Sequence, residues 1–125
     1  MVSSVASANE ALLDAFRAAV GNENVLADAA TRQRYQTTTY RSSPTIPAIV
    51  LPKSTGEVQA CVRIANQFKA PLYPISTGMN YGYGSRVPTA DNCIVLELSR
   101  MRAILELNEA LGYVTLEPGV TQKQL

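Results

Sequence analysis

Residues 48–75 hold the pattern that most limits the fold, because two short apolar runs flank a helical segment there. The first run, residues 48–51 (AIVL), is β-branched and bounded by prolines, as expected of a buried strand. Ser54 and Glu57 then have capping-box spacing, and a helix of about fourteen residues is predicted after them. The second run is residues 72–75 (LYPI). This order predicts a βαβ unit, which requires a parallel pair of strands.

Three further apolar segments extend this unit into a sheet. Residues 93–98 form a third expected strand, and residues 103–107 and 113–116 form two more. The last two are separated by the short sequence NEALG, which suits a hairpin. We therefore expect an α/β fold (α+β in the wider sense) with a small mixed sheet.

The N-terminal part predicts a helix and little regular structure after it. Ser7 and Glu10 have capping-box spacing, and Gly21 can end the helix. Residues 22–45 are polar without a clear period, which predicts a helical turn followed by an extended surface segment. The apolar residues between the two ends of the helix fall on one stripe: Leu12, Leu13, Phe16, Ala19 and Val20.

The chain is expected to divide into an N-terminal helix with its extended segment, residues 1–46, and a main unit, residues 47–125. Thr121 and Gln124 again have capping-box spacing, although the sequence ends at Leu125. A helix start without its helix predicts a truncated polypeptide.

Composition narrows the classes of function. The 125 residues are 46% hydrophobic and 17% charged, as in one soluble globular domain, and a net charge of +1 argues against a nucleic-acid surface. The chain has no histidine, so no Ser/His or Cys/His catalytic pair is available and neither a catalytic residue nor a metal site is expected. Cys61 and Cys93 lie in apolar runs and are expected to be buried thiols. Without a signal peptide or an apolar span, a soluble, cytoplasmic protein is expected.

Residues 74–85, PISTGMNYGYGS, hold three of the seven glycines and no charged side chain. They do not fit the standard phosphate motifs. A Walker A loop requires a different glycine spacing and a lysine, and a dinucleotide fingerprint requires a third glycine where Val87 stands, with a helix that Pro88 disfavours.

A loop of this composition can still bind an anion. Glycines admit positive φ, so successive N–H groups can turn inward as a nest for a diphosphate, and the loop contains no carboxylate that would repel it. Side-chain donors are available at Ser76, Thr77, Asn80 and Ser85. The alternative is a flexible connection between strands. Tyr81 and Tyr83 argue against that alternative, because a linker seldom carries aromatic residues, and they are expected to be packing residues rather than stacking platforms.

A second segment, residues 117–121 (EPGVT), places a Pro-Gly turn after the last strand. By itself it fits an ordinary type II turn. If the preceding strands return the chain to the glycine loop, its backbone amides are expected to close the other side of the same ligand site.

Taken together, these segments resemble the FAD-linked oxidoreductases of the vanillyl-alcohol oxidase and p-cresol methylhydroxylase type. The resemblance covers residues 47–125 and rests on residues 47–85, on NCIVLELSRM and on YVTLEPGVT in that order. It implies that the chain forms the first FAD-binding subdomain and binds FAD. The residues implied are Ser76, Thr77, Gly78, Met79, Asn80, Tyr81 and Gly82 around the diphosphate with Ser85 nearby, Pro74 and Ile75 beside the adenosine half, and Glu117, Gly119 and Val120 in a second wall.

The resemblance also implies an activity for the whole protein: hydride transfer from a para-substituted phenol to the flavin. The phenol-binding residues, and any side chain attached to the flavin, belong to a later domain, so the implied partners are the rest of the oxidoreductase or a second chain, with a homo-oligomer possible. The alternative is a non-catalytic α/β module for binding or assembly. An exposed apolar patch would distinguish a part of a larger protein from such a module.

Overall fold

The computed structural model describes residues 2–39, 44–79 and 86–125, with side chains from residue 8 onward. Its centre is a four-stranded sheet in the order β1-β2-β4-β3. The strands are β1 (Val25–Leu26), β2 (Ile49–Val50), β3 (Leu72–Ile75) and β4 (Ile94–Glu97). The β1 strand pairs antiparallel with β2, whereas β2 and β3 each pair parallel with β4, so the predicted mixed sheet is confirmed.

One detail of the predicted βαβ unit is wrong, because β2 and β3 do not pair with each other. The third strand, β4, lies between them and hydrogen-bonds to both. All four residues of β4 are buried, as expected of a central parallel strand. The crossover helix therefore joins two strands that flank β4.

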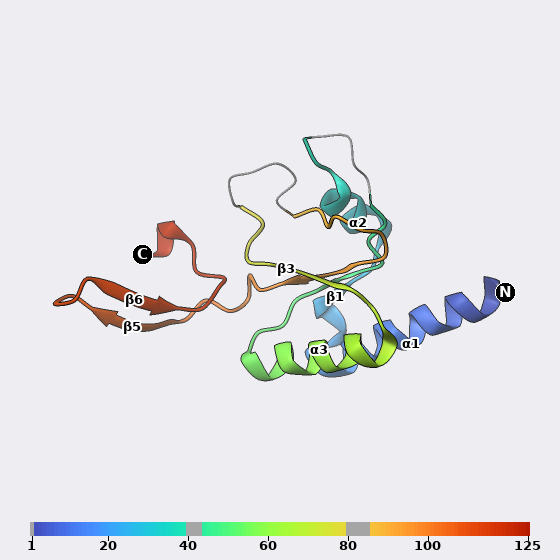
Figure 1. The fold of residues 1–125 in the computed structure, drawn as a ribbon, viewed down its shortest axis with the longest axis horizontal. Coiled ribbons are helices and arrows are strands. Elements are labelled where there is room, and N and C mark those ends of the chain that lie inside the picture. Colours follow the sequence, from blue (N-terminus) through green and yellow to red (C-terminus); the bar gives the residue numbers. More distant parts are fainter. Residues whose placement is uncertain (1, 40–43, 80–85) are drawn as a thin grey trace.

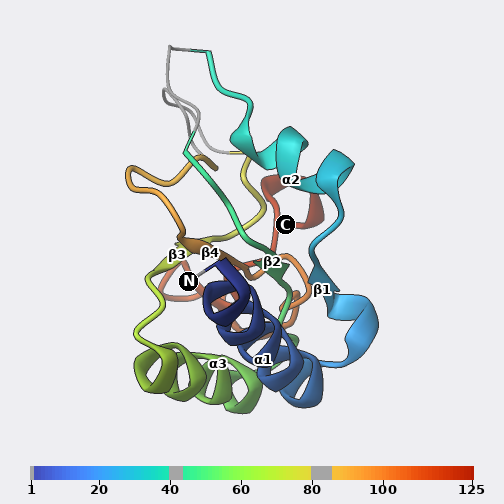
Figure 2. The same ribbon diagram turned by 90° about the vertical axis from the view of Figure 1, so that its right-hand side faces the viewer.

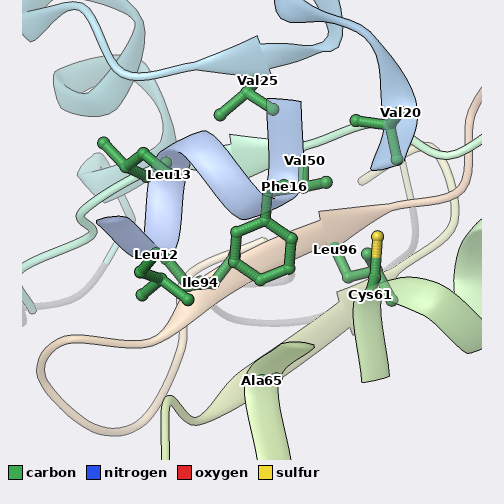
Figure 3. Packing of buried hydrophobic residues seen from close by; sticks show 11 residues of the cluster. Leu12, Leu13, Phe16, Val20, Val25, Val50, Cys61, Ala65, Ile94 and Leu96 are labelled. Atoms are coloured by element: carbon green, nitrogen blue, oxygen red, sulfur yellow. The ribbon is translucent and has the colours of Figure 1, made fainter. Parts of the chain in front are cut away.

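Helices cover both faces of this sheet (Figures 1 and 2). The helices α1 (Val2–Val20) and α3 (Thr55–Phe68) lie on one face, and α2 (Ala29–Gln36) lies on the other. Figure 3 shows the core beneath α1 and α3, where Phe16 points toward the sheet beside Ile94 and Leu96. The buried stripe of α1 confirms the predicted amphipathic helix, and Cys61 is buried in this core as expected.

The opposite face carries a second apolar cluster that contains Tyr35 of α2 together with Ile49, Ile75 and Val95 of the strands. Side chains alternate along a strand, so Ile94 and Leu96 face α1 and α3 while Val95 and Glu97 face the other way. Glu97 thus places a buried carboxylate next to α2 at the end of β4.

The ends of α3 follow from its sequence. Ser54 is the predicted N-cap, and its Oγ accepts a hydrogen bond from the Glu57 N–H at 3.3 Å. The Glu57 carboxylate accepts from the Lys53 N–H at 2.8 Å, one residue before the position that a capping box uses. The helix spans 14 residues and ends at Lys69, which has a φ of 54° in the left-handed region.

Two expectations for the N-terminal part are wrong. The α1 helix begins at Val2, so Ser7 lies inside it rather than at its start. The segment after α1 begins with the 3₁₀ helix Asn22–Asn24, which fits the expected helical turn, but the expected extended part contains the strand β1 and the two-turn helix α2, which Asp28 caps through the Thr31 N–H. The α2 helix buries little besides Tyr35, so it leaves almost no apolar period in the sequence.

The C-terminal part is the predicted hairpin, formed by β5 (Ile104–Asn108) and β6 (Tyr113–Leu116). The expectation that these strands extend the main sheet is wrong, because they form a two-stranded sheet of their own. Gly112 has a φ of +66° in its turn. Figure 1 shows the hairpin extending away from the four-stranded sheet. After it, a short 3₁₀ helix, Gln122–Gln124, begins at Thr121, whose N–H donates to Oε1 of Gln124. Within the described ranges, no helix has the length and apolarity that a bilayer crossing requires.

Candidate FAD site

The carboxyl ends of three parallel strands lie at one edge of the sheet. Leu51 follows β2, Ser76 follows β3 and Leu98 follows β4. In open sheets with parallel strands, ligands bind outside these carboxyl ends. The predicted glycine loop begins at this edge.

The described start of that loop is open to solvent and has one backbone conformation that favours glycine. Ser76 and Met79 are exposed, whereas Thr77 and Gly78 are half-buried. Gly78 has a φ of +69°, as an anion-binding nest requires of a glycine. The predicted site residues Asn80, Tyr81, Gly82 and Ser85 lie outside the described residues. Whether the loop forms a complete nest therefore stays a prediction.

The residues predicted beside the adenosine half belong to β3. Pro74 is exposed and pairs in register with Leu96, and Ile75 is buried in the second apolar cluster. The Ile75 carbonyl accepts a hydrogen bond from the Leu98 N–H at 2.9 Å. This bond fixes the start of the glycine loop to the chain that leaves β4.

The predicted second wall reaches the same place. Gly119 is buried, and its N–H donates to the Met101 carbonyl at 2.8 Å. A Cβ at Gly119 would lie 2.5 Å from the Leu98 carbonyl oxygen and 2.6 Å from that of Met101, so only glycine fits this approach of two backbone segments. Through Leu98, the structure brings Gly119 and Ile75 together at the carboxyl edge.

One expectation for this wall is wrong: its amides do not face a ligand. The N–H groups of Glu117, Gly119 and Val120 donate to the carbonyls of Ala103, Met101 and Glu117 at 2.9, 2.8 and 3.1 Å. The Glu117 carboxylate likewise accepts from the Ala103 N–H at 2.8 Å. The hairpin and the turn satisfy each other's backbone groups, so a cofactor contact from this wall has to use other atoms.

Sequence reasoning missed a polar cluster beside the loop. The Tyr35 hydroxyl donates to the Glu97 carboxylate, and both side chains are buried. The Arg86 guanidinium carbon lies 5.7 Å from the centroid of the Tyr35 ring. Burial, followed by the hydrogen bond to Glu97, raises the pKa of Tyr35 to about 12, so its hydroxyl stays a donor. The available signal was one carboxylate inside the apolar run of β4.

These groups fit an anionic, phosphate-bearing cofactor. Hydroxyls at Ser76 and Thr77 and the positive φ of Gly78 suit phosphate oxygens, and the Arg86 side chain lies alongside. The two nearby carboxylates, those of Glu97 and Glu117, already accept hydrogen bonds from Tyr35 and Ala103. The edge therefore offers donors and a positive charge to a diphosphate, with its carboxylates turned to internal partners.

Comparisons with known proteins agree with this chemistry. Residues 46–125 match the family model described as FAD binding domain. The chain is 53% identical over 116 residues to 1'-carboxy-chondrochloren decarboxylase from Chondromyces crocatus, covering 93% of this chain and 21% of that protein. It is 34% identical over 113 residues to the 4-cresol dehydrogenase [hydroxylating] flavoprotein subunit from Pseudomonas putida, covering 88% of this chain and 22% of that one.

Solved structures show the same fold. A p-cresol methylhydroxylase with substrate bound matches 94% of this chain with a TM-score of 0.88 and 31% identity, over 24% of its own length. The 4-ethylphenol oxidase from Gulosibacter chungangensis matches 95% with a TM-score of 0.86 and 36% identity, also over 24% of its length. The chain thus spans about a fifth to a quarter of these relatives. The predicted fold class and the predicted cofactor, FAD, are confirmed, and the chain belongs to the FAD binding domain family.

Proposed function

We propose that this chain is the FAD-binding part of a flavin oxidoreductase that oxidises a para-substituted phenol. The observation that carries the proposal is its likeness to p-cresol methylhydroxylase, with a TM-score of 0.88 at 31% identity over 94% of the chain. A structure named 4-ethylphenol oxidase is similar to the same extent. Both names describe enzymes that act on alkylated phenols.

In this proposal the chain holds and orients the cofactor. The loop at residues 76–82, with Ser85, binds the diphosphate; Pro74 and Ile75 lie beside the adenosine half; Glu117, Gly119 and Val120 form a second wall. When bound, FAD supplies a hydride acceptor. The chain's own contribution is binding energy and a fixed cofactor position, and residues that bind the phenol belong elsewhere in the working protein.

A second candidate reaction is a decarboxylation. The 53% identity to a protein named 1'-carboxy-chondrochloren decarboxylase exceeds the 34% identity to the 4-cresol dehydrogenase subunit. Identity within an FAD-binding domain reports on the cofactor site more than on the substrate. The two candidates therefore share this chain's role and differ in the substrate domain.

An exposed apolar hairpin supports a part of a larger flavoprotein over an independent binding module. Leu105 and Leu107 of β5 are 62% and 67% exposed, and Leu111 in the turn is 74% exposed. Such a patch on a two-stranded hairpin, which is marginally stable alone, is typical of a surface that another part of the protein covers. The relatives' additional length is consistent with such a covering part.

The experiment is anaerobic reduction of the purified working protein, in which this chain is present together with the part that binds the phenol. We expect it to carry flavin absorbance through gel filtration, and 4-ethylphenol to bleach that absorbance. If no 4-alkylphenol bleaches the flavin and the protein releases carbon dioxide from an aryl carboxylic acid, the decarboxylase candidate is favoured. A folded protein that retains no FAD would contradict both and favour the non-catalytic module.

A further inference from the structure

The Arg86 side chain lies against the start of the glycine loop. A Cβ built on Gly78 would be 3.1 Å from Cδ of Arg86 and 3.5 Å from its Cβ and Cγ. The aliphatic part of Arg86 therefore packs over the one loop residue that has positive φ within residues 76–79. This contact places the side chain at the carboxyl edge of the sheet.

A second contact fixes the other end of the side chain. The Arg86 guanidinium lies over the Tyr35 ring at 5.7 Å, within the range of a cation–π interaction. The Tyr35 ring is itself held, because its hydroxyl donates to the buried carboxylate of Glu97. Arg86 is thus positioned by α2 through Tyr35 and by the loop through Gly78.

This cation has no carboxylate partner in the part of the chain that the structure describes. The salt bridges found there both belong to Arg17 of α1, which pairs with Glu10 and Asp14. The buried carboxylate of Glu97 accepts the Tyr35 hydroxyl instead. A half-buried guanidinium resting on an aromatic face keeps N–H donors available for an anion.

We propose that Arg86 is a diphosphate-binding residue of this site, positioned by Tyr35 and Gly78. A guanidinium can donate two parallel hydrogen bonds to phosphate oxygens, which adds direction as well as charge. The inference rests on the proposed FAD-binding function and goes beyond it, because it adds a side-chain cation to a loop whose residues 74–85 carry none. It also gives the Tyr35–Glu97 pair a role, which is to hold the platform under that cation.

The competing explanation is that Arg86 only attaches the loop to α2. Titration of the apoprotein with FAD, ADP and adenosine separates the two explanations. Arg86→Met keeps an unbranched apolar chain over Gly78 and removes the charge. Arg63→Met is the matched control, because Arg63 is exposed on α3, which covers the sheet face opposite Tyr35.

We expect Arg86→Met to raise the Kd for FAD and for ADP about ten- to a hundredfold, because the variant loses a charge-assisted hydrogen bond to phosphate. The Kd for adenosine, which has no phosphate, should stay unchanged. Added salt should weaken FAD binding less in this variant than in the wild type. Arg86→Lys keeps the positive charge but loses the paired donors of the guanidinium, so its Kd for FAD should lie between those of the wild type and Arg86→Met. Arg63→Met should have the Kd of the wild type.

Equal affinities for FAD in Arg86→Met and the wild type would overturn this inference and leave FAD binding intact. An equal loss of affinity for ADP and for adenosine would also overturn it, because such a loss would mean that the substitution changed the shape of the site and not its contact with phosphate. A wild type that binds no FAD would overturn the proposed function, and this inference with it. Thermal unfolding of each apoprotein checks the fold, and Arg86→Gln replaces Arg86→Met if that variant does not fold.

Discussion

At the scale of single residues, Gly78 is the most direct test of the diphosphate loop. Gly78→Asp adds a side chain at a φ of +69°, crowds Arg86 at 3.1 Å and brings a carboxylate toward two phosphate charges. We expect the variant to lose FAD retention in gel filtration. Gly112→Asp is the matched control, since Gly112 has a φ of +66° with no atom within 4 Å of an added Cβ. Retention of FAD by both variants would refute a role for Gly78 in the site.

The Tyr35–Glu97 pair predicts a stability change at high pH. The pKa of Tyr35 is raised from 10.0 to about 12, so its stabilising contribution is complete below pH 10 and is lost as the pH rises toward 12. The free energy of unfolding, compared between the wild type and Tyr35→Phe by urea denaturation, should differ by a constant amount between about pH 7 and pH 9. That difference should shrink by about 2 kcal/mol by pH 12.

The comparison with Tyr35→Phe also removes other titrations in this range. Burial raises the pKa of Cys61 from 9.0 to about 11, so Cys61 lowers stability over an overlapping range of pH in both proteins. Its contribution cancels in the difference between them. A difference that stays constant through pH 12 would show that the Tyr35 hydroxyl titrates alike in the folded and unfolded chains.

At the scale of elements, α3 ends at a residue with a strained left-handed backbone conformation, which a glycine would relieve. Lys69 has a φ of 54°, while the N–H groups of Lys69 and Ala70 donate to the carbonyls of Asn66 and Ala65 in a Schellman motif. Lys69→Gly relieves the left-handed strain and should raise the free energy of unfolding by about 1 kcal/mol in urea denaturation. Gln67→Gly, inside the helix, should lower it by about 1 kcal/mol. Destabilisation by both variants would contradict this account of the helix end.

The elements that the sequence predicted best are those whose side chains fill the main core. The α3 helix has apolar residues at helical spacing and β4 is a continuous apolar run, and both supply buried residues to that core and lie within the predicted ranges. The α2 helix escaped prediction because its single buried residue is Tyr35, and β1 because its short apolar run lies among polar residues. The start of α1 was misplaced because Ser7 offers a capping pattern that tertiary context does not use.

For the site, the sequence predicted the backbone features and missed the side-chain cluster. Glycines at 78 and 119 are visible in the sequence, and the structure gives each a physical reason, positive φ for one and close backbone approach for the other. The meeting of Tyr35, Arg86 and Glu97 depends on which faces of α2 and β4 oppose each other. A hydrogen bond between residues 35 and 97 has no local sequence signal, so only the fold shows it.

At the scale of the whole molecule, the hairpin should make the 125-residue chain associate with itself. Leu105 and Leu107 of β5 are both more than half exposed, and the pairing with β6 is irregular between Ile104 and Glu106. The Tyr113 hydroxyl donates to Glu106 at 2.6 Å. Exposed apolar faces and unpaired strand edges both favour association. Sedimentation velocity should show oligomers of the chain, and Leu105→Lys with Leu107→Lys should shift them to monomers. Val62→Lys, a change at a side chain of α3 that is 42% exposed, should leave the oligomers in place. If the wild-type chain and the double variant sediment alike as monomers, the hairpin is stable in water without a covering partner, and an independent module becomes the better description of this chain.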